Sequence, residues 1–434
     1  MQAALRRPVH DRHERRGGPC KQAAVSSFLA IFVALLAAGY YGLLILQANV
    51  GLAATSRGVT VPLRLLMLAL LAGIFFLQPV VRWTRSHTLL SAFAAVYGAR
   101  IAVEVGKSSS FHLPPEEILF YFAGFAILPF FTISNLRLRT ADFYRILRIL
   151  TLSLLASAAL VLQFYGQWIG EVDRLSLAVT REDNYISPLA LSYAGALGIG
   201  IAFACLATGT AAKRWHLLAL LLISLVPFFL GASRGSVVAL TSSVLLVLVA
   251  QRRLRGALKT LAVAAPASLA LVFATNLFGT GVFDRILRLS SDVEAGASSA
   301  IRLRIWEATV AQFWESPLVG DSLETEQFSS YPHNIVLESL VSTGLAGTIP
   351  LVALLASGLV LAFRLPARAP TLSWISVFYV QSLTQAMFSG ALYSAGNVFC
   401  SLALLLVAHR ALRADPRPSS AARPARLRRP LYES

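Results

Sequence analysis

Long apolar segments alternate with short polar ones along most of this chain. A helix needs about 20 mainly apolar residues to cross the hydrocarbon core of a bilayer, and most of these segments have that length. They are residues 24–46, 60–81, 87–105, 116–134, 149–169, 187–208, 216–232, 235–250, 259–277, 333–363, 371–388 and 393–409. The pattern predicts an all-α polytopic membrane protein with about twelve transmembrane helices.

Composition agrees with this prediction. The 434 residues are 56% hydrophobic and only 14% charged, whereas a soluble domain carries roughly 25% charged residues. The first apolar segment follows a basic stretch and is too long for the core of a signal peptide, so we expect it to remain as the first span. Cys20, Cys205 and Cys400 are scattered and predict neither a disulfide framework nor a metal cluster.

The net charge of +17 is distributed unevenly between the loops. With the N-terminus inside, most of the 38 basic residues fall in cytoplasmic loops, as the positive-inside rule requires. We therefore predict a bacterial inner-membrane protein whose basic N-terminal segment 1–23 and basic tail 410–434 are both cytoplasmic. Anionic membrane lipids are sufficient partners for these basic segments, and we expect no nucleic-acid partner.

In this topology residues 24–277 hold the first nine spans and residues 333–409 the last three. The segment 278–332 between them is a large periplasmic loop, far longer than a simple connection. Apolar residues recur at helical spacing over residues 298–315, which predicts an amphipathic helix lying on the outer surface.

Only two of the seven histidines fall on the predicted outer side, His112 and His333. His112 lies in a polar loop beside two prolines, as an ordinary surface residue would. His333 follows Pro332, and proline commonly occupies the first position of a helix, so we expect His333 to open the long span 333–363. The positive end of the helix dipole favours the neutral imidazole that a general base needs.

Outer-side arginines form a second group of candidates. A guanidinium matches two phosphate oxygens at once and stays charged at any physiological pH, so the group predicts a diphosphate ligand at the membrane surface. The candidates are Arg234, Arg302, Arg304, Arg181 and Arg100. Arg100 lies inside a span, as does Arg64; alternatively, Arg100 pairs with Glu104 one turn on, and Arg64 extends to the interface.

Two of these arginines cannot share a role, because Arg302 and Arg304 lie about 200° apart around a helix. We expect Arg302 to face the site, with Trp306 one turn on, and Arg304 to face solvent. Arg234 is predicted to lie at the tip of a hairpin where Gly235 permits a tight turn.

Acidic residues give only a weak metal signal. The short spacings are Glu171/Asp173, Asp292/Glu294 and Glu324/Glu326. Such spacings are common in loops, and no nucleotide-binding pattern has the required context. We therefore expect neither a metal nor another cofactor.

Three segments resemble the O-antigen ligase family, which shares its core with O-antigen polymerases and protein O-oligosaccharyltransferases. The segments are Gly231-Ala-Ser-Arg-Gly-Ser236; Arg302-Leu-Arg-Ile-Trp306 with Glu315-Ser-Pro-Leu-Val-Gly320; and Tyr331-Pro-His-Asn334 with Leu337-Glu338 and Gly344-Leu-Ala-Gly347. They lie within residues 190–360. Asp321 departs from the pattern, since a second glycine is expected close behind Gly320.

The resemblance implies a GT-C-like, inverting, metal-independent glycosyltransferase. Its donor would be a glycan on undecaprenyl diphosphate, and its acceptor a sugar hydroxyl of the lipid A-core. His333 would be the general base, Arg234 and Arg302 would bind the diphosphate, and the supporting residues would be Asn334, Glu338 and Trp306. An O-antigen polymerase or a protein O-oligosaccharyltransferase remains an alternative. A transporter of lipid-linked sugars is less favoured, because the charged candidates lie at the outer ends of spans.

Overall fold

The computed structural model describes residues 19–51, 57–79, 82–105, 111, 113–169, 175, 187–209, 214–251 and 298–414. Within these residues all regular structure is helical, apart from one isolated bridge between Thr325 and Ser330. The predicted span 259–277, the first part of the predicted outer loop and most of both basic termini lie outside the described residues.

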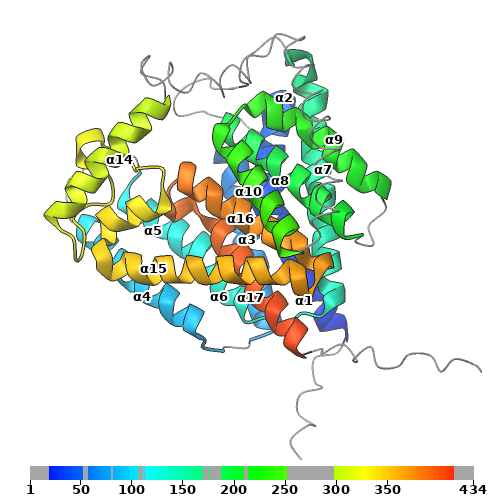
Figure 1. The fold of residues 1–434 in the computed structure, drawn as a ribbon, viewed down its shortest axis with the longest axis horizontal. Helices are drawn as coiled ribbons and strands as arrows, with labels where there is room; N and C mark the ends of the chain where they lie inside the picture. The colour runs from blue at the N-terminus through cyan, green and yellow to red at the C-terminus, as the bar shows by residue number, and fades with distance from the viewer. Residues whose placement is uncertain are drawn as a thin grey trace, which may run out of the picture.

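The described part of the first half of the chain forms a series of helices (Figure 1). Their bounds are α1 Pro19–Ala34, η2 Leu35–Gly39, α2 Tyr40–Val50, α3 Arg57–Leu77, α4 Arg85–Val105, α5 Pro115–Tyr121, η3 Phe122–Ile127, α6 Leu128–Ser134, α7 Thr140–Tyr165, η4 Gly166–Trp168, α8 Pro188–Thr208, α9 Arg214–Gly231 and α10 Arg234–Ala250. The segments η2 and η3 are π-helical turns that continue the helices on either side of them.

The second described part begins with a helix outside the bundle and ends with three apolar helices. Their bounds are α14 Ser298–Glu315, η5 Glu326–Phe328, α15 Ile335–Arg368, η6 Pro370–Leu372, α16 Ser373–Phe388, η7 Leu392–Ser394 and α17 Gly396–Ala414. The predicted helix 298–315 is confirmed as α14.

Nine helical segments among the described residues are long and apolar enough to cross a membrane, and α10 is a shorter apolar helix. Every apolar segment predicted from the sequence and described here is helical over most of its length. The prediction of an all-α polytopic membrane protein is therefore confirmed. α16 has 16 residues and is deeply buried, so it packs inside the bundle instead of facing lipid.

The helices pack closely at α8, which contacts α9, α10 and α16. Gly195 and Gly198 on α8 face α9, where a Cβ atom on Gly195 would lie 2.5 Å from the backbone nitrogen of Phe228. Small residues allow helix backbones in a membrane to approach in this way. This approach holds the α9–α10 turn against the start of α8.

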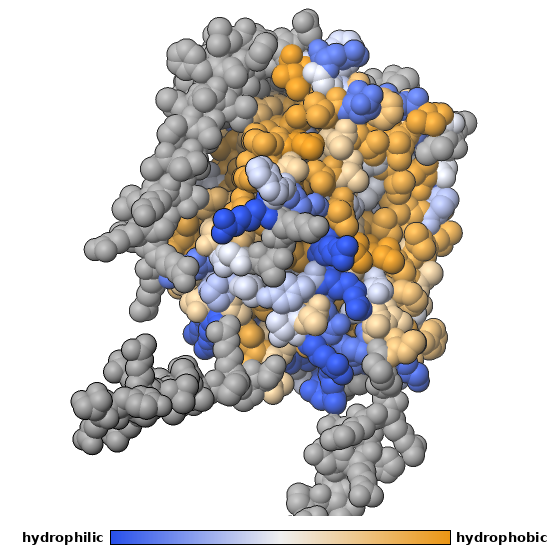
Figure 2. Space-filling model, turned by 90° about the vertical axis from the view of Figure 1, so that its right-hand side faces the viewer, coloured by the Kyte–Doolittle hydropathy of each residue, from blue (hydrophilic) through white to orange (hydrophobic). Residues whose placement is uncertain are grey.

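Large apolar side chains cover much of the outside of the bundle. Phe76, Trp215 and Leu222 are 78%, 83% and 60% exposed. Figure 2 shows a broad apolar surface, with hydrophilic side chains across the lower half of the view and a smaller group at its upper edge. An exposed apolar surface of this extent is what a lipid-facing protein presents, so the chain is a multi-pass membrane protein.

One end of the bundle brings together the turns that carry the candidate site residues. The starts of α8, α10, α15 and α17, the last turn of α16, and α14 all lie there (Figure 1). We call it the site end; it is the end that the sequence predicts to lie outside. α14 packs on α15 and buries Ile305, Thr309 and Phe313 against the protein, while Ile301 is half-exposed.

Candidate functional site

The α9–α10 turn carries the first candidate arginine. The chain reverses at Ala232, which has a φ of 42°, and Arg234 is the first residue of α10. The prediction that Gly235 makes the turn is wrong. Gly235 lies inside the helix, where a Cβ atom would collide with the Tyr193 hydroxyl and touch Phe388. Its missing side chain permits close packing instead of backbone reversal.

Serine hydroxyls hold this turn to α8. Ser192 donates to or accepts from Ser236 at 2.5 Å, and it also accepts from the backbone N–H of Ser233 at 3.3 Å. Ser236 in turn donates to the Ser233 carbonyl oxygen at 2.7 Å. All three serines are buried, so Arg234 starts from a rigid backbone.

Arg302 reaches the same place from α14. Its Nη1 donates to the carbonyl oxygen of Phe388, the last residue of α16, at 2.7 Å. Because a Cβ atom at Gly235 would lie 3.4 Å from Phe388, Arg302 and the Arg234 turn meet around this residue. Burial lowers the pKa of Arg302, and the neighbouring phenols of Tyr193 and Tyr331 oppose this effect.

The two faces of α14 differ as predicted. Arg302 is half-buried and bonded to Phe388, whereas Arg304 is exposed. Trp306, one turn beyond Arg302, donates its indole N–H to the Pro332 carbonyl oxygen at 2.7 Å. A single helix therefore positions both a candidate phosphate ligand and the backbone next to His333.

The His333 turn precedes α15 instead of opening it. The helix begins at Ile335, so the prediction that proline starts it is wrong. Asn334 is the N-cap: its Oδ1 accepts from the backbone N–H groups of Val336 at 3.0 Å and Leu337 at 3.2 Å. This side chain satisfies helix donors that a proline start would leave open. His333 itself has a φ of 55°, in the left-handed region, which is uncommon for a residue other than glycine.

A row of tyrosines leads away from His333. The Tyr331 ring meets the His333 ring edge to face at 4.5 Å, and Tyr393 lies 6.2 Å from Tyr331. Tyr393 then stacks with Tyr121 at 6.1 Å, and the Tyr121 hydroxyl accepts from Arg64 at 2.6 Å. Sequence reasoning missed these tyrosines, although Tyr331 stands inside a segment that carries the family resemblance.

The carboxyl groups of Glu338 and Glu324 are buried near this row. Glu338 is 1% exposed, and its Oε2 accepts from the backbone N–H of Leu392 at 2.8 Å. Burial raises the pKa of the Tyr331 phenol, Glu338 and Glu324 raise it further, and Arg302 lowers it. Glu338, which the sequence predicts as a supporting residue, therefore lies next to the His333 turn, one helical turn after Asn334.

The structure separates the acidic pair Glu324 and Glu326. Glu324 is 3% exposed, whereas Glu326 is exposed. Two carboxylates that point to different environments cannot chelate one cation. Within the described ranges no three His, Cys, Asp or Glu side chains form a group that could hold a metal ion.

The side chain of Arg100 is held by contacts within the protein. Its guanidinium donates to backbone carbonyl oxygens of the turn after α14, at Val319, Gly320 and Asp321, and to Ser342 on α15 at 3.2 Å. It also forms an ion pair with Glu104 at 3.5 Å, which is the alternative that the sequence offered for this residue. With its donors occupied in this way, Arg100 is not available as a diphosphate ligand.

Arg100 braces the place where two of the family-like segments interlock. α15 is broken at Gly344, which has a φ of 57°, and the backbone N–H of Leu345 donates to Pro317 at 2.8 Å. Gly320 has a φ of 69° and packs against the backbone of Ser342. The interlock fixes where α14 ends relative to α15.

Several predicted residues lie outside the described residues. They are Arg181, His112 and the acidic pairs Glu171/Asp173 and Asp292/Glu294.

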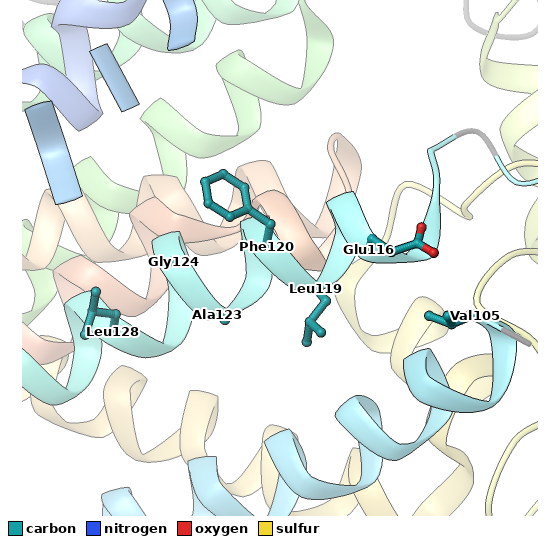
Figure 3. A pocket seen from close by; sticks show the side chains of 7 residues that line it. All are labelled: Val105, Glu116, Leu119, Phe120, Ala123, Gly124 and Leu128. Atoms are coloured by element: carbon teal, nitrogen blue, oxygen red, sulfur yellow. The ribbon is translucent and has the colours of Figure 1, made fainter. Parts of the chain in front are cut away.

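Two hollows adjoin the site end. A cavity of about 220 Å³ lies between η2, α2, α8, α16 and the start of α17, and Tyr193 is one of its walls. A wider groove of about 520 Å³ runs along α5 and η3, with Glu116 and Val105 at one end and Leu128 at the other (Figure 3). Apart from Glu116 its lining is apolar, which suits a hydrocarbon chain.

Residues 219–352 match the model of the O-antigen ligase family. No protein in the curated comparison matches the chain. The matched range contains the α9–α10 turn, α14, the His333 turn and the interlock around Gly344. The described site residues outside it lie on α3, α4, α5, α8, α16 and η7. The resemblance to this family is confirmed, and it supports a function of the ligase or polymerase type.

Proposed function

We propose that this protein of the O-antigen ligase family is a GT-C-like, inverting glycosyltransferase of lipopolysaccharide biosynthesis. It transfers O-antigen polysaccharide from undecaprenyl diphosphate to a sugar hydroxyl of the lipid A-core. The observation that carries the proposal is the arrangement around α14: Arg302 meets the Arg234 turn at Phe388, while Trp306 on the same helix holds the His333 turn.

His333 is the proposed general base. It takes the proton from the acceptor hydroxyl as that oxygen attacks the anomeric carbon of the donor sugar. The bond between this carbon and the diphosphate oxygen breaks from the opposite side, so the configuration at the anomeric carbon inverts. Asn334 supports this step by capping α15, and the buried Glu338 lies one turn further on.

Arg234 and Arg302 are the proposed ligands of the diphosphate. Negative charge develops on the diphosphate as the bond breaks, and preorganised cationic donors stabilise that charge. Arg302 has further N–H groups beyond the one that binds Phe388, so it can still donate hydrogen bonds to two phosphate oxygens. Arg304 and Arg181 are weaker candidates. Fixed arginine charges take the place of a metal ion here, so we propose metal-independent transfer.

We further propose that the site end faces the periplasm and that both termini are cytoplasmic, in the inner membrane. The uneven distribution of basic residues supports this orientation. The site then meets lipid-linked glycan at the surface where its diphosphate lies.

The decisive experiment supplies purified protein with undecaprenyl-diphosphate-linked glycan and offers two acceptors separately. Transfer to lipid A-core supports a ligase. Transfer only to a second lipid-linked glycan supports the alternative, an O-antigen polymerase, whose chemistry at the donor is the same. No transfer to either acceptor, with folded protein and intact donor, contradicts both.

A further inference from the structure

The cavity beside Tyr193 contains polar groups that the proposed chemistry leaves unused. Its walls come from helices far apart in the chain, and its volume is about 220 Å³. Among its lining residues are three tyrosines and three amides, namely Tyr40, Tyr41, Tyr193, Gln381, Gln385 and Asn397. We refer to it as the amide cavity.

The orientation of the Gln381 amide is fixed by its partners. Its Nε2 donates to the carbonyl oxygen of Ala196 at 3.1 Å, and a carbonyl can only accept. The same nitrogen contacts Ser243 Oγ at 3.0 Å. Gln381 is 3% exposed, and its Oε1 is buried with no hydrogen-bond partner in the described part of the chain.

Asn397 gives the cavity a second acceptor of the same kind. Its Oδ1 is also buried without a hydrogen-bond partner among the described residues. Buried polar atoms in proteins are nearly always paired, because an unpaired one loses its hydrogen bonds to water without replacement. The two side chains that carry these unpaired oxygens both line the cavity, so a ligand bound there that donates hydrogen bonds is the partner they lack.

This requirement selects among the groups of a lipid-linked glycan. A diphosphate at neutral pH offers acceptors, and a prenyl chain offers neither donors nor acceptors. Sugar hydroxyl groups and acetamido N–H groups are donors. The tyrosine rings add apolar faces, against which the C–H side of a sugar can lie. Sites for drug-sized ligands have volumes of about 300–1,000 Å³, so the smaller amide cavity has room for about one ring.

The amide cavity also lies beside the proposed diphosphate site. Tyr193 lines it and interacts electrostatically with Arg302. The same Tyr193 hydroxyl packs against Gly235, next to Arg234. On another wall Tyr40 interacts with Arg64. A single tyrosine side chain would thus separate a ring bound here from Arg302, Arg234 or Arg64.

We propose that the amide cavity binds one sugar ring, whose donors pair with Gln381 Oε1 and Asn397 Oδ1. The proposal rests on the function proposed above, because the sugar is brought by one of its two substrates. The ring is either the sugar attached to the donor diphosphate or a sugar of the acceptor, and the chemistry of recognition is the same for both.

The test compares the binding of two lipids to the purified full-length protein in nanodiscs: bare undecaprenyl diphosphate and undecaprenyl diphosphate carrying one N-acetylhexosamine. If the ring is the donor sugar, wild-type protein should bind the sugar-bearing lipid about tenfold more tightly, the worth of one or two hydrogen bonds. Asn397→Leu removes an acceptor and fills the cavity, so it should bring the two affinities within about twofold. Asn397→Asp keeps an acceptor oxygen and should retain most of the difference.

Ala194→Leu provides an independent variant, since it fills the cavity from α8 and leaves both amides in place. It should also abolish the preference for the sugar-bearing lipid while binding the bare lipid normally. Monodisperse elution and an unchanged melting temperature show that a variant is folded.

The outcomes separate the two proposals. If both filling variants lose the preference for the sugar-bearing lipid, the ring belongs to the donor. If both bind the donor normally but have a raised KM for the acceptor, the ring belongs to the acceptor. Unchanged donor binding and unchanged KM in both variants would overturn the sugar site. Arg302→Ala tests the diphosphate separately, because it should weaken both lipids. If it weakens neither, the proposed role of Arg302 fails whatever the filling variants show.

Discussion

Trp306 and Pro332 lie 26 residues apart, and the indole N–H of Trp306 donates to the Pro332 carbonyl oxygen at 2.7 Å. The bond ties α14 to the residue directly before His333. Because Arg302 lies one turn earlier on α14, the same helix sets the positions of the proposed base and of a proposed phosphate ligand.

Trp306→Phe keeps an aromatic ring but removes the N–H that holds Pro332. Loss of one such bond is worth about 1 kcal/mol, so kcat should fall about fivefold while the KM for the donor changes little. Steady-state kinetics on purified protein measure both constants. Trp314→Phe is the matched control, because Trp314 lies on the same helix and is 70% exposed. Equal effects of the two variants would show that the bond has no special role.

His333→Ala should lower transfer by about 10²–10⁴-fold, the usual contribution of a general base. Donor binding should remain, since the arginines are untouched. His216→Ala is the control, because His216 contacts Thr151 on α7, away from the site end. A His333 variant that transfers glycan at nearly the wild-type rate would leave the base unidentified, with Glu338 the next residue to examine.

Lysine should fail to replace arginine at positions 234 and 302, because an ammonium group cannot reproduce the guanidinium fork. Arg304→Lys should be tolerated, since Arg304 is exposed. Parallel transfer assays of the three lysine variants test this. An inactive Arg304→Lys beside an active Arg302→Lys would mean that α14 presents its other face to the donor.

Transfer by the purified enzyme should survive EDTA, because the proposed diphosphate ligands carry fixed positive charge. The assay is run with and without chelator, followed by addition of Mg²⁺ or Mn²⁺. Loss of activity that either ion restores would contradict metal independence. Attention would then move to the acidic pairs Glu171/Asp173 and Asp292/Glu294.

Arg100→Ala should destabilise the protein more than it changes the chemistry. The substitution leaves several backbone carbonyl oxygens of the turn after α14 without their donor, at a cost of about 2–4 kcal/mol. The melting temperature in detergent should therefore fall clearly, whereas Arg304→Ala should not change it. A normal melting temperature with lost donor binding would return Arg100 to the list of phosphate ligands.

The sequence alone determined the positions of most of the described helices. A backbone inside lipid must satisfy its own hydrogen bonds, so an apolar segment of sufficient length can only form a helix, and that decision is local. The helix 298–315 followed from apolar spacing in the same way and was found with the predicted bounds. The predicted start of α15 was two residues too early, because Asn334 caps the helix and Pro332 does not begin it.

Only the tertiary structure decided which side chains meet. Arg100 and Ser342 lie 242 residues apart, and nothing near Arg100 in the chain indicates that backbone carbonyl oxygens would occupy its guanidinium. Likewise, Tyr393 joins Tyr331, and Gln381 and Asn397 share one cavity, only after α16 and α17 pack against the rest of the bundle. Hydropathy specifies that a segment is helical, but the rotation of each helix toward its neighbours depends on packing between distant segments.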